Sequence, residues 1–521
     1  MLLITLALSA CGSPSEGDDF GAAPPDAHAP ADLAQAEDLA QDVDGGSGPS
    51  VTPGAINRIL LDGTIVLPDQ VIEGQVLVED AVITCVEPGT ACAQMTAAMG
   101  ATLIQTEGII APGLIDTHNH ILFDVFNEDD WSPTQLYQNH NAWTTDPRYQ
   151  AMLDVKQCLS NDAQGKPTWC ANTPYGNATG SLRCEMDKFG ELKGLIAGTT
   201  SIVGLPGTSS GCFSSLVRSI DVPQNELDTD TVQTSAIFPP SKASGDGVCA
   251  NFASGKTTAY LVHCGEGVDA ASLAEFQKLG SLTTTPGCLL APQTTITHGT
   301  AFGAAEFATM AQHQMKLTWS PASNVFLYGS TANIPAALDA GVTIALAPDW
   351  SMGGSQNLLD ELRFAQGWDH THFGDRLAPK DLVRMTTENA AQALALADRI
   401  GRIQVGYFAD LAVFAGDRSH AYDAIIAASP KDVLLTMVGG QALYGAAVLK
   451  DAGPAFPACE MLDVCGTPKF LCAATLETTM KLNQTSADIE GALQQAMLDA
   501  DAQTPTDGWN FAPLPPLVKC P

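Results

Sequence analysis

Two histidines one residue apart close an apolar segment, IIAPGLIDTHNHI, that runs from Ile109 to Ile121. In a β-strand, residues i and i+2 point to the same side, so His118 and His120 would project together. Two neutral imidazoles placed in this way can share one metal ion. Ordinary loop histidines can have the same spacing, and the pair alone does not separate the two alternatives. Other motifs in the sequence are needed to distinguish a metal-binding pair from ordinary loop histidines.

Three further segments place reactive side chains directly after an apolar run. YLVHCGEG brings a predicted strand to His263 and continues to Glu266, and TTITHGT brings the next one to His298. TIALAPDW brings a later one to Asp349. Taken singly, such a histidine can be a loop residue and such an aspartate can cap the next helix. Parallel strands of an α/β barrel, however, end on one face, which holds the active site. The shared position of these residues therefore predicts one site.

Strand and helix patterns alternate through the centre of the chain. From about residue 185, MDKFGELKGLIAG, ASLAEFQKLG and IPAALDAG predict helices, whereas TTSIVGL, KLTWSPASN and the three segments above predict strands. Repeated strand–helix units indicate a parallel sheet with helices outside it. About seven barrel strands can be placed, so closure with eight is an extrapolation. Short apolar runs in 56–112, and again in YFADLAVFAG and VLLTMVGGQALYG, predict β-structure on both flanks.

The motifs PGLIDTHNH, HCGE, THG, SPASN and APDW resemble, in order and context, those of the amidohydrolase superfamily. The branch that they resemble contains cytosine and guanine deaminases, triazine hydrolases and imidazolonepropionases. The resemblance covers roughly residues 56–450 and implies an α/β fold. It implies a (β/α)8 TIM-type barrel over 113–402 and a small β-sandwich formed by 54–112 and 403–450. Residues 451–521 would be a cysteine-containing C-terminal extension with one amphipathic helix, in which Ile489, Leu493 and Met497 share a packing face.

The resemblance also implies a metal site with one divalent cation. Its ligands would be three neutral imidazoles and one carboxylate, from His118, His120, His263 and Asp349. This donor set suits zinc, which we expect, and also iron or manganese. Family members with two metals bridge them with a lysine or glutamate at the end of a middle strand. Lys242 lies several residues beyond the apparent end of VQTSAIFPPSK, so we expect one metal.

The catalytic roles that the resemblance implies fall on three residues. Glu266 would take a proton from the attacking water and pass it to the leaving nitrogen. His298 would hydrogen-bond that water or the developing oxyanion. Asp349 would also bond the attacking water.

Substrate contact is a weaker expectation, because pocket loops vary within the superfamily. The long segment 123–185 would line the pocket, although a structural role is the alternative for its residues. The candidates from this segment and from the later motifs are His140, Trp143, Arg148, Asn324 and Trp350. A second HxH pair, His370 and His372, has no strand before it, so we expect a loop there.

The N-terminus, MLLITLALSACGS, resembles a bacterial lipoprotein signal that ends in a lipidated cysteine, Cys11. One departure is that no Lys or Arg precedes the apolar run. An ordinary terminus containing one cysteine is the alternative. Residues 12–53, rich in Ala, Pro and Asp, would then be a disordered acidic linker. We expect an exported protein in the bacterial cell envelope that is held at the membrane only through a lipid on Cys11.

The net charge indicates which kinds of partner the protein can bind, and the cysteine content indicates in which kind of cellular compartment it folds. The net charge of −34, from 24 Lys and Arg against 58 Asp and Glu, gives no electrostatic reason to bind nucleic acid. We expect a small-molecule substrate, and a homo-oligomer is open. The 14 cysteines include close clusters without a CxxC pair, which favours disulfides in an oxidising compartment over a zinc ribbon. Cys264, between His263 and Glu266, is the cysteine expected to stay unpaired.

Two classes of function remain from the sequence. The first is a metal-dependent hydrolase of C–N bonds other than peptide bonds, a deaminase or a cyclic amide or amidine hydrolase on a small nitrogen-rich compound. A halide, linear amide or ester leaving group is open within it, because the chemistry of the activated water is the same. The second is an exported, non-catalytic scaffold that binds a metal or ligand. The four expected ligands are present together with Glu266, which favours the enzyme.

Overall fold

The computed structural model describes residues 48–161, 166–204, 216–222, 227, 231–235, 238–454, 459–476, 481–503 and 510–520. The expected signal segment with Cys11, and the part of the expected linker before residue 48, lie outside the described residues. No helix among the described residues is both long enough and apolar enough to cross a membrane.

Among the described residues, eight short strands, each parallel to the strands it pairs with, follow in chain order and form the barrel. They are β6 (Leu114–Asp116), β7 (Thr199–Ile202), β8 (Arg218–Ser219), β9 (Val232–Ser235), β10 (Ala259–Cys264), β11 (Thr294–His298), β12 (Lys316–Trp319) and β13 (Thr343–Leu346). They pair in two arcs, β6–β7–β8 and β9–β10–β11–β12–β13. Beyond β6 and β13 the backbone of Asp349 bridges the first and last strands: its N–H donates to the His118 carbonyl at 3.2 Å, and its carbonyl accepts from the His120 N–H at 2.6 Å. The expected eight-stranded barrel is confirmed.

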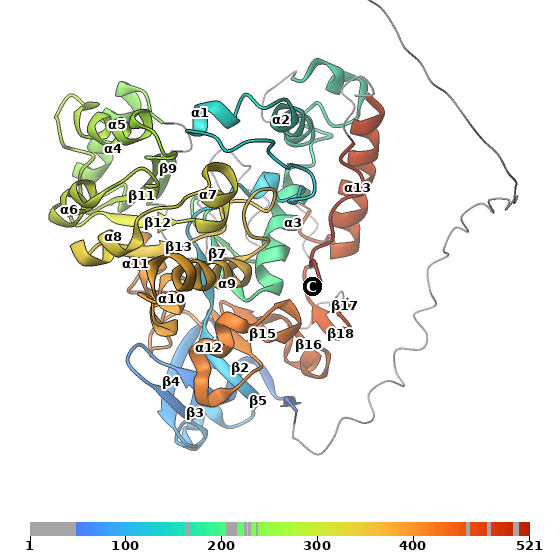
Figure 1. The fold of residues 1–521 in the computed structure, drawn as a ribbon. Helices are drawn as coiled ribbons and strands as arrows, with labels where there is room; N and C mark the ends of the chain where they lie inside the picture. The colour runs from blue at the N-terminus through green and yellow to red at the C-terminus, as the bar shows by residue number, and fades with distance from the viewer. Residues whose placement is uncertain are drawn as a thin grey trace, which may run out of the picture. The chain divides into compact units, whose positions relative to one another are not determined.

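Helices follow most barrel strands and lie around them (Figure 1). They are α3 (Arg183–Ile196), α4 (Lys242–Ser254), α5 (Ala270–Ser281), α6 (Ala304–Gln312), α7 (Pro321–Tyr328), α8 (Ile334–Ala340), α9 (Leu358–Trp368), α10 (Pro379–Met385) and α11 (Glu388–Ala393). All six residues of β10 are buried, as expected for a parallel strand covered on both faces.

Three local expectations were wrong. The end of the expected disordered linker is ordered, because Ser50–Thr52 form a strand, β1, that pairs with Leu103–Gln105. SPASN does not continue its strand, because β12 ends at Trp319 and α7 begins at Pro321. Proline suits a first helical turn, since it lacks the N–H that has no helical acceptor there. The second HxH pair is not in a loop: His370 and His372 lie in an exposed helical turn, Asp369–Phe373, directly after α9. The His372 ring stacks on Trp368 with ring centres 3.6 Å apart.

The two flanks of the barrel join in one ten-stranded sheet. From the N-terminal flank come β1 (Ser50–Thr52), β2 (Ala55–Val66), β3 (Val71–Glu79), β4 (Val82–Pro88) and β5 (Ala101–Pro112). From the C-terminal side come β14 (Leu411–Phe414), β15 (Val433–Val438), β16 (Gln441–Ala446), β17 (Glu460–Val464) and β18 (Thr467–Leu471), with α12 (Ala421–Ala427) between β14 and β15. Antiparallel pairing of β5 with β14 unites the flanks. The last two strands belong to the C-terminal extension, for which the sequence predicted only a helix.

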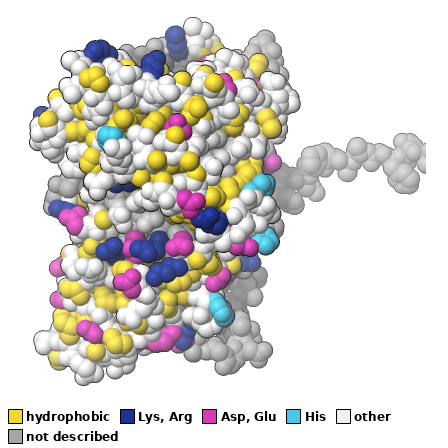
Figure 2. Space-filling model, turned by 60° about the vertical axis from the view of Figure 1, so that its left-hand side comes forward, with side chains coloured by type: hydrophobic (Ala, Val, Ile, Leu, Met, Phe, Trp, Pro, Cys, Tyr) yellow, Lys and Arg dark blue, Asp and Glu magenta, His cyan; other side chains and the backbone are white. Residues whose placement is uncertain are grey.

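The buried ion pair of Arg218 and Asp410 connects this sheet to the barrel. The guanidinium of Arg218, in β8, donates to both carboxylate oxygens of Asp410 at 2.7 and 3.0 Å. Charged side chains of opposite sign also lie next to each other on the surface. On the face of the molecule seen in Figure 2, Lys and Arg side chains lie beside Asp and Glu side chains across the middle.

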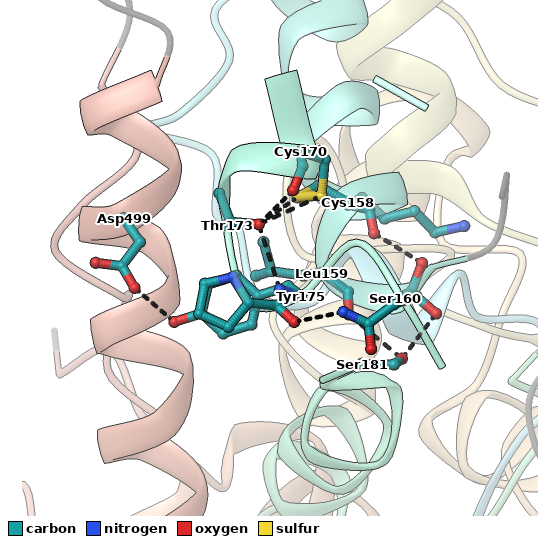
Figure 3. Close-up of a disulfide and its surroundings, with 11 residues drawn as sticks. Cys158, Leu159, Ser160, Cys170, Thr173, Tyr175, Ser181 and Asp499 are labelled. Carbon is teal, nitrogen blue, oxygen red and sulfur yellow. Dashed lines mark hydrogen bonds between the residues drawn. A yellow bond between two sulfur atoms is a disulfide. The ribbon is translucent and has the colours of Figure 1, made fainter. Parts of the chain in front are cut away.

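The segment between β6 and α3 carries α1 (His140–Trp143) and α2 (Pro147–Ser160). The extension helix α13 (Ser486–Gln503) packs against α3 (Figure 1), with Ile489, Leu493 and Met497 fully buried as expected. Figure 3 shows the disulfide that joins Cys158 of α2 to Cys170 in the following segment, and the Tyr175 hydroxyl, which donates to Asp499 of α13 at 2.7 Å. The extension thus braces the segment that precedes α3.

Disulfides occur within the close cysteine clusters and also outside them. Besides Cys158–Cys170, the described pairs are Cys85–Cys92, Cys249–Cys288, Cys459–Cys472 and Cys465–Cys520. Cys264 is free and buried, as expected.

Candidate metal centre

The histidine pair follows β6 in a turn that Asp116 holds. The Asp116 carboxylate is buried and accepts the backbone N–H of His118 at 3.0 Å and the side-chain amide of Asn119 at 2.9 Å. A hydrogen bond from a backbone N–H to the side chain of an aspartate two residues earlier forms a common type of local turn. This turn directs both imidazoles toward Asp349.

Asp349 lies after β13, on the opposite side of the barrel seam. Its Oδ1 is 3.0 Å from Nε2 of His118 and 3.4 Å from Nε2 of His120. Neither His118 Nε2 nor Asp349 Oδ1 has a hydrogen-bond partner among the described residues, although both atoms are buried. Buried polar atoms without partners are costly, and a cation between them would satisfy both.

His263 and His298 complete the cluster from neighbouring strands. The His263 ring centre is 4.6 Å from that of His118 and 5.4 Å from that of His120. The His298 ring centre is 5.1 Å from that of His263. Ligand atoms within 4.8 Å of one another form two overlapping triads, one of His118, His263 and His298 and one of His118, His120 and Asp349. The structure therefore brings together all five residues predicted from the strand ends.

The four imidazoles are neutral at pH 7, because burial lowers their pKa values. The pKa of His118 and that of His263 fall to about 3, and those of His120 and His298 also fall well below the usual range. A neutral imidazole keeps the lone pair that a metal needs. Burial also raises the pKa of the Asp349 carboxyl, while the neighbouring His120 and the Ser323 hydroxyl lower it. The three or four neutral imidazoles and the carboxylate fit a divalent cation, which would compensate these buried groups for the water contacts that burial removes.

Hydrogen bonds at the far ring nitrogens separate the roles of His263 and His298. Nδ1 of His263 lies 3.1 Å from the Ser235 carbonyl, which can only accept, so Nδ1 carries the proton and Nε2 keeps its lone pair. This is the usual support of a metal-binding histidine.

His298 has the opposite polarity. The Trp319 indole donates to the Thr331 hydroxyl at 2.7 Å, and that hydroxyl donates to Oδ1 of Asn324 at 3.3 Å. The Asn324 amide nitrogen therefore faces Nδ1 of His298, at 3.1 Å, and donates to it. Nδ1 is then the acceptor, and the proton of the neutral ring lies on Nε2. His298 is thus arranged as a hydrogen-bond donor rather than as a ligand.

Backbone strain concentrates at two of these residues. His298 and Asp349 adopt left-handed conformations with φ of +74° and +72°. Residues other than glycine adopt this region rarely, at a cost of about 1–3 kcal/mol each, and such residues cluster at functional sites.

Glu266 lies beside the histidine cluster. Its Oε1 accepts a hydrogen bond from the Tyr328 hydroxyl at 2.7 Å, and its Oε2 is 4.0 Å from Nε2 of His298. Burial raises the pKa of Glu266 to about 7. A carboxyl with such a pKa can both accept and release a proton near neutral pH.

The five residues considered for substrate contact have different surroundings. Trp350 lies beside the cluster, with its ring centre 5.2 Å from that of His120. Asn324 supports His298, and the Trp143 indole donates to the Tyr328 hydroxyl at 2.7 Å. His140 pairs with Glu275 at 2.8 Å. Arg148 donates to the Asp130 carbonyl at 2.6 Å and lies over the ring of Phe511 in the extension, so the structure does not bring it to the cluster.

Several neighbours of the cluster carried no signal in the sequence. Tyr328 and Tyr149 are the clearest cases, since neither belongs to a motif. Tyr149 packs edge-on against Trp143 with ring centres 4.9 Å apart, and it stacks on Phe123 at 6.0 Å. Lys242, considered as a bridge for a second metal, lies at the start of α4 with an exposed side chain, paired with Asp246.

Comparison with known proteins agrees with this geometry. Residues 233–443 match the model of the amidohydrolase family. The matched part contains His263, Glu266, His298 and Asp349, and the histidine pair precedes it. Among solved structures, a triazine hydrolase variant aligns with a TM-score of 0.56 at 17% identity over 77% of this chain and 96% of its own. The zinc complex of atrazine chlorohydrolase from Arthrobacter aurescens aligns with a TM-score of 0.54 at 17% identity, over 77% of this chain and 97% of its own. These likenesses establish an amidohydrolase-type fold.

Curated relatives match over a shorter stretch. A 5-methylthioadenosine/S-adenosylhomocysteine deaminase of Halobacterium salinarum is 34% identical over 165 residues, which are 30% of this chain and 38% of that protein. The corresponding deaminase of Thermococcus onnurineus is 30% identical over 158 residues, 28% of this chain and 37% of its own. The chain thus spans less than two fifths of the length of these relatives.

Proposed function

We propose that this protein is a metal-dependent hydrolase that cleaves C–N bonds, other than peptide bonds, in a small nitrogen-rich molecule. The observation that carries the proposal is the buried pair of partnerless atoms, Nε2 of His118 and Oδ1 of Asp349, beside a glutamate whose pKa is about 7. A scaffold that only binds a metal would use the first feature but would not need the second. The matches to deaminases support this class of reaction.

One divalent cation, for which zinc is the first candidate, would be held by His118, His120, His263 and Asp349. When bound, it would polarise a water molecule and lower the pKa of that water toward neutrality. His298 is left out of the ligand set because its Nε2 carries the proton. That N–H is available to donate to the oxygen on which negative charge develops.

Glu266 would carry the proton through the reaction. The water oxygen bonds to the substrate carbon while a water proton passes to Oε2 of Glu266. The same proton then passes to the nitrogen as the C–N bond breaks, and the carboxylate is restored. A pKa near 7 suits both halves of this transfer. Trp350 and the aromatic residues around it would form the apolar wall of the substrate pocket.

We further propose that the protein is exported and lipid-anchored at Cys11. The lipoprotein-like N-terminal sequence and the five described disulfides, which suit an oxidising compartment, support this location.

The test combines metal content with turnover by the purified full-length protein. We expect about one zinc per chain, lost in His263→Ala, and ammonia release from a substrate such as 5-methylthioadenosine, S-adenosylhomocysteine or another aminated heterocycle. Chloride release from atrazine without ammonia release from any substrate would assign the site to a different leaving group. A metal-loaded protein without turnover would favour the binding scaffold.

The variant Glu266→Gln keeps the shape of the side chain but cannot shuttle the proton. It should retain the metal and lose turnover by about 10²- to 10⁴-fold. Glu87→Gln, at an exposed position of β4, is the matched control and should leave both unchanged. Loss of metal in Glu266→Gln would contradict the assignment of Glu266 as a proton carrier.

A further inference from the structure

A buried hydrogen-bond chain connects the segment before α3 to the proposed proton carrier. The Trp143 indole nitrogen donates to the Tyr328 hydroxyl at 2.7 Å, and this hydroxyl donates to Oε1 of Glu266 at 2.7 Å. Exposed fractions are 7% for Trp143, 4% for Tyr328 and 6% for Glu266. The three residues come from three elements: α1, the last position of α7, and the loop after β10.

The direction of both hydrogen bonds follows from the donors. An indole nitrogen can donate but cannot accept, so the Tyr328 oxygen must be the acceptor in its contact with Trp143. The Tyr328 hydroxyl donates its own proton to Oε1 of Glu266. In this arrangement Oε1 is an acceptor, and a proton on Glu266 lies on Oε2. Oε2 is the oxygen on the side of His298, 4.0 Å from its Nε2.

Backbone hydrogen bonds fix Trp143 in this position. The N–H of Tyr137 donates to the Leu327 carbonyl at 2.8 Å, and that of Val268 donates to the Gln138 carbonyl at 2.8 Å. The N–H of His140 donates to the Glu266 carbonyl itself at 3.2 Å. Backbone hydrogen bonds therefore attach the segment that carries Trp143 to the end of α7, which carries Tyr328, and to the loop after β10, which carries Glu266.

We propose that Trp143 and Tyr328 are positioning residues that keep Oε1 of Glu266 occupied and so reserve Oε2 for the transferred proton. The proposal rests on the role of Glu266 in the proposed function. It assigns to the segment before α3 a part in proton transfer in addition to lining the pocket. Burial raises the pKa of Glu266, and the Tyr328 hydrogen bond lowers it, as expected for a donor to the carboxylate.

The first test needs neither substrate nor activity. The full-length protein, labelled with ¹⁵N at its seven tryptophans, gives one indole N–H signal for each ring in a two-dimensional NMR spectrum. Trp143→Phe identifies the signal of Trp143 by its loss. We expect this signal to move upfield in Tyr328→Phe, which removes its acceptor. Tyr175→Phe, which removes a hydroxyl bonded to Asp499 instead, is the matched control and should leave it in place. A signal that stays in place in Tyr328→Phe would overturn the proposal.

The second test is a double-mutant cycle on turnover of whichever C–N substrate the protein accepts. Tyr328→Phe should lower kcat by about 10- to 100-fold, as expected for loss of one hydrogen bond to a charged group, with little change in KM or metal content. Trp143→Phe should cost less, and the double variant should be no slower than Tyr328→Phe, because Trp143 acts through Tyr328. Additive losses, or loss of metal in Tyr328→Phe, would contradict the relay. Absence of turnover in the unmodified protein would refute the proposed function, while the indole signals would still decide whether the chain exists.

Discussion

Asn324→Asp is the most direct way to reverse the polarity of His298. In the protein, the Asn324 amide donates to Nδ1 of His298 over 3.1 Å. Aspartate has nearly the same shape but presents an oxygen at that position. Two lone pairs would then face each other, so the imidazole must move its proton to Nδ1. Nε2 would lose the proton that it offers to the reacting oxygen.

The size of the effect follows from the loss of one preorganised donor. Removal of a single donor to a developing oxyanion costs about 10²- to 10³-fold in kcat, which is about 2.7–4 kcal/mol. The added carboxylate also favours the imidazolium, so it should raise the pKa of His298. The imidazolium carries protons on both nitrogens and restores the Nε2 donor. The deficit should therefore be greatest at high pH and should shrink as the pH falls.

The assay is the pH dependence of kcat for Asn324→Asp relative to the unmodified protein, together with zinc content. Thr331→Ser keeps the hydroxyl that orients the amide and serves as the control, with kcat expected within about twofold. The reasoning would be refuted by a deficit that is the same at every pH. It would also be refuted if Asn324→Asp kept its zinc and its full kcat, because a His298 that acts as a ligand through Nε2 needs no proton there.

Two further predictions concern Glu266 and the junction of the barrel with the flanking sheet. The base form of Glu266 is the carboxylate and its pKa is about 7, so kcat/KM should fall about tenfold per pH unit below pH 7 and level off above it. The residual rate of Glu266→Gln should not show this fall at low pH. Equal pH profiles for the two proteins would be inconsistent with the assignment of Glu266 as the base. Asp410→Asn should lower the free energy of unfolding, measured by urea titration, by about 3–5 kcal/mol, because the buried Arg218 charge loses its carboxylate partner. As a control, Asp339→Asn in the exposed pair with Arg376 should lower it by at most about 1 kcal/mol. Similar losses in the two variants would show that burial does not set the cost of breaking the ion pair.

The strand-end residues of the site could be predicted because their signal is local. An apolar run that ends in histidine or aspartate, repeated at successive strands, is enough to place these side chains on one face of a barrel. The five residues found in this way all lie in the cluster. The C-terminal strands β17 and β18 were missed, because short strands at the edge of a sheet have little periodicity, and here disulfides help to hold them.

The contacts that support the cluster could not be predicted, because they join residues far apart in the sequence. Tyr328 and Glu266 are 62 positions apart, and Trp143 and Tyr328 are 185 positions apart. No spacing rule reaches that far. The sequence marked Arg148 as a pocket candidate and passed over its neighbour Tyr149. In the structure Tyr149 packs against Trp143, whereas Arg148 lies against Phe511 in the extension.

Indoles begin both hydrogen-bond chains at the site, and their shared chemistry helps to fix the proton positions on His298 and Glu266. Trp319 acts through Thr331 and Asn324 to place a proton on Nε2 of His298. Trp143 acts through Tyr328 to keep one oxygen of Glu266 free for a proton. A hydroxyl or an amide at the head of either chain could reverse its direction, because such groups both donate and accept. A donor that cannot accept removes that freedom, so the direction of the first hydrogen bond in each chain is set before any substrate binds.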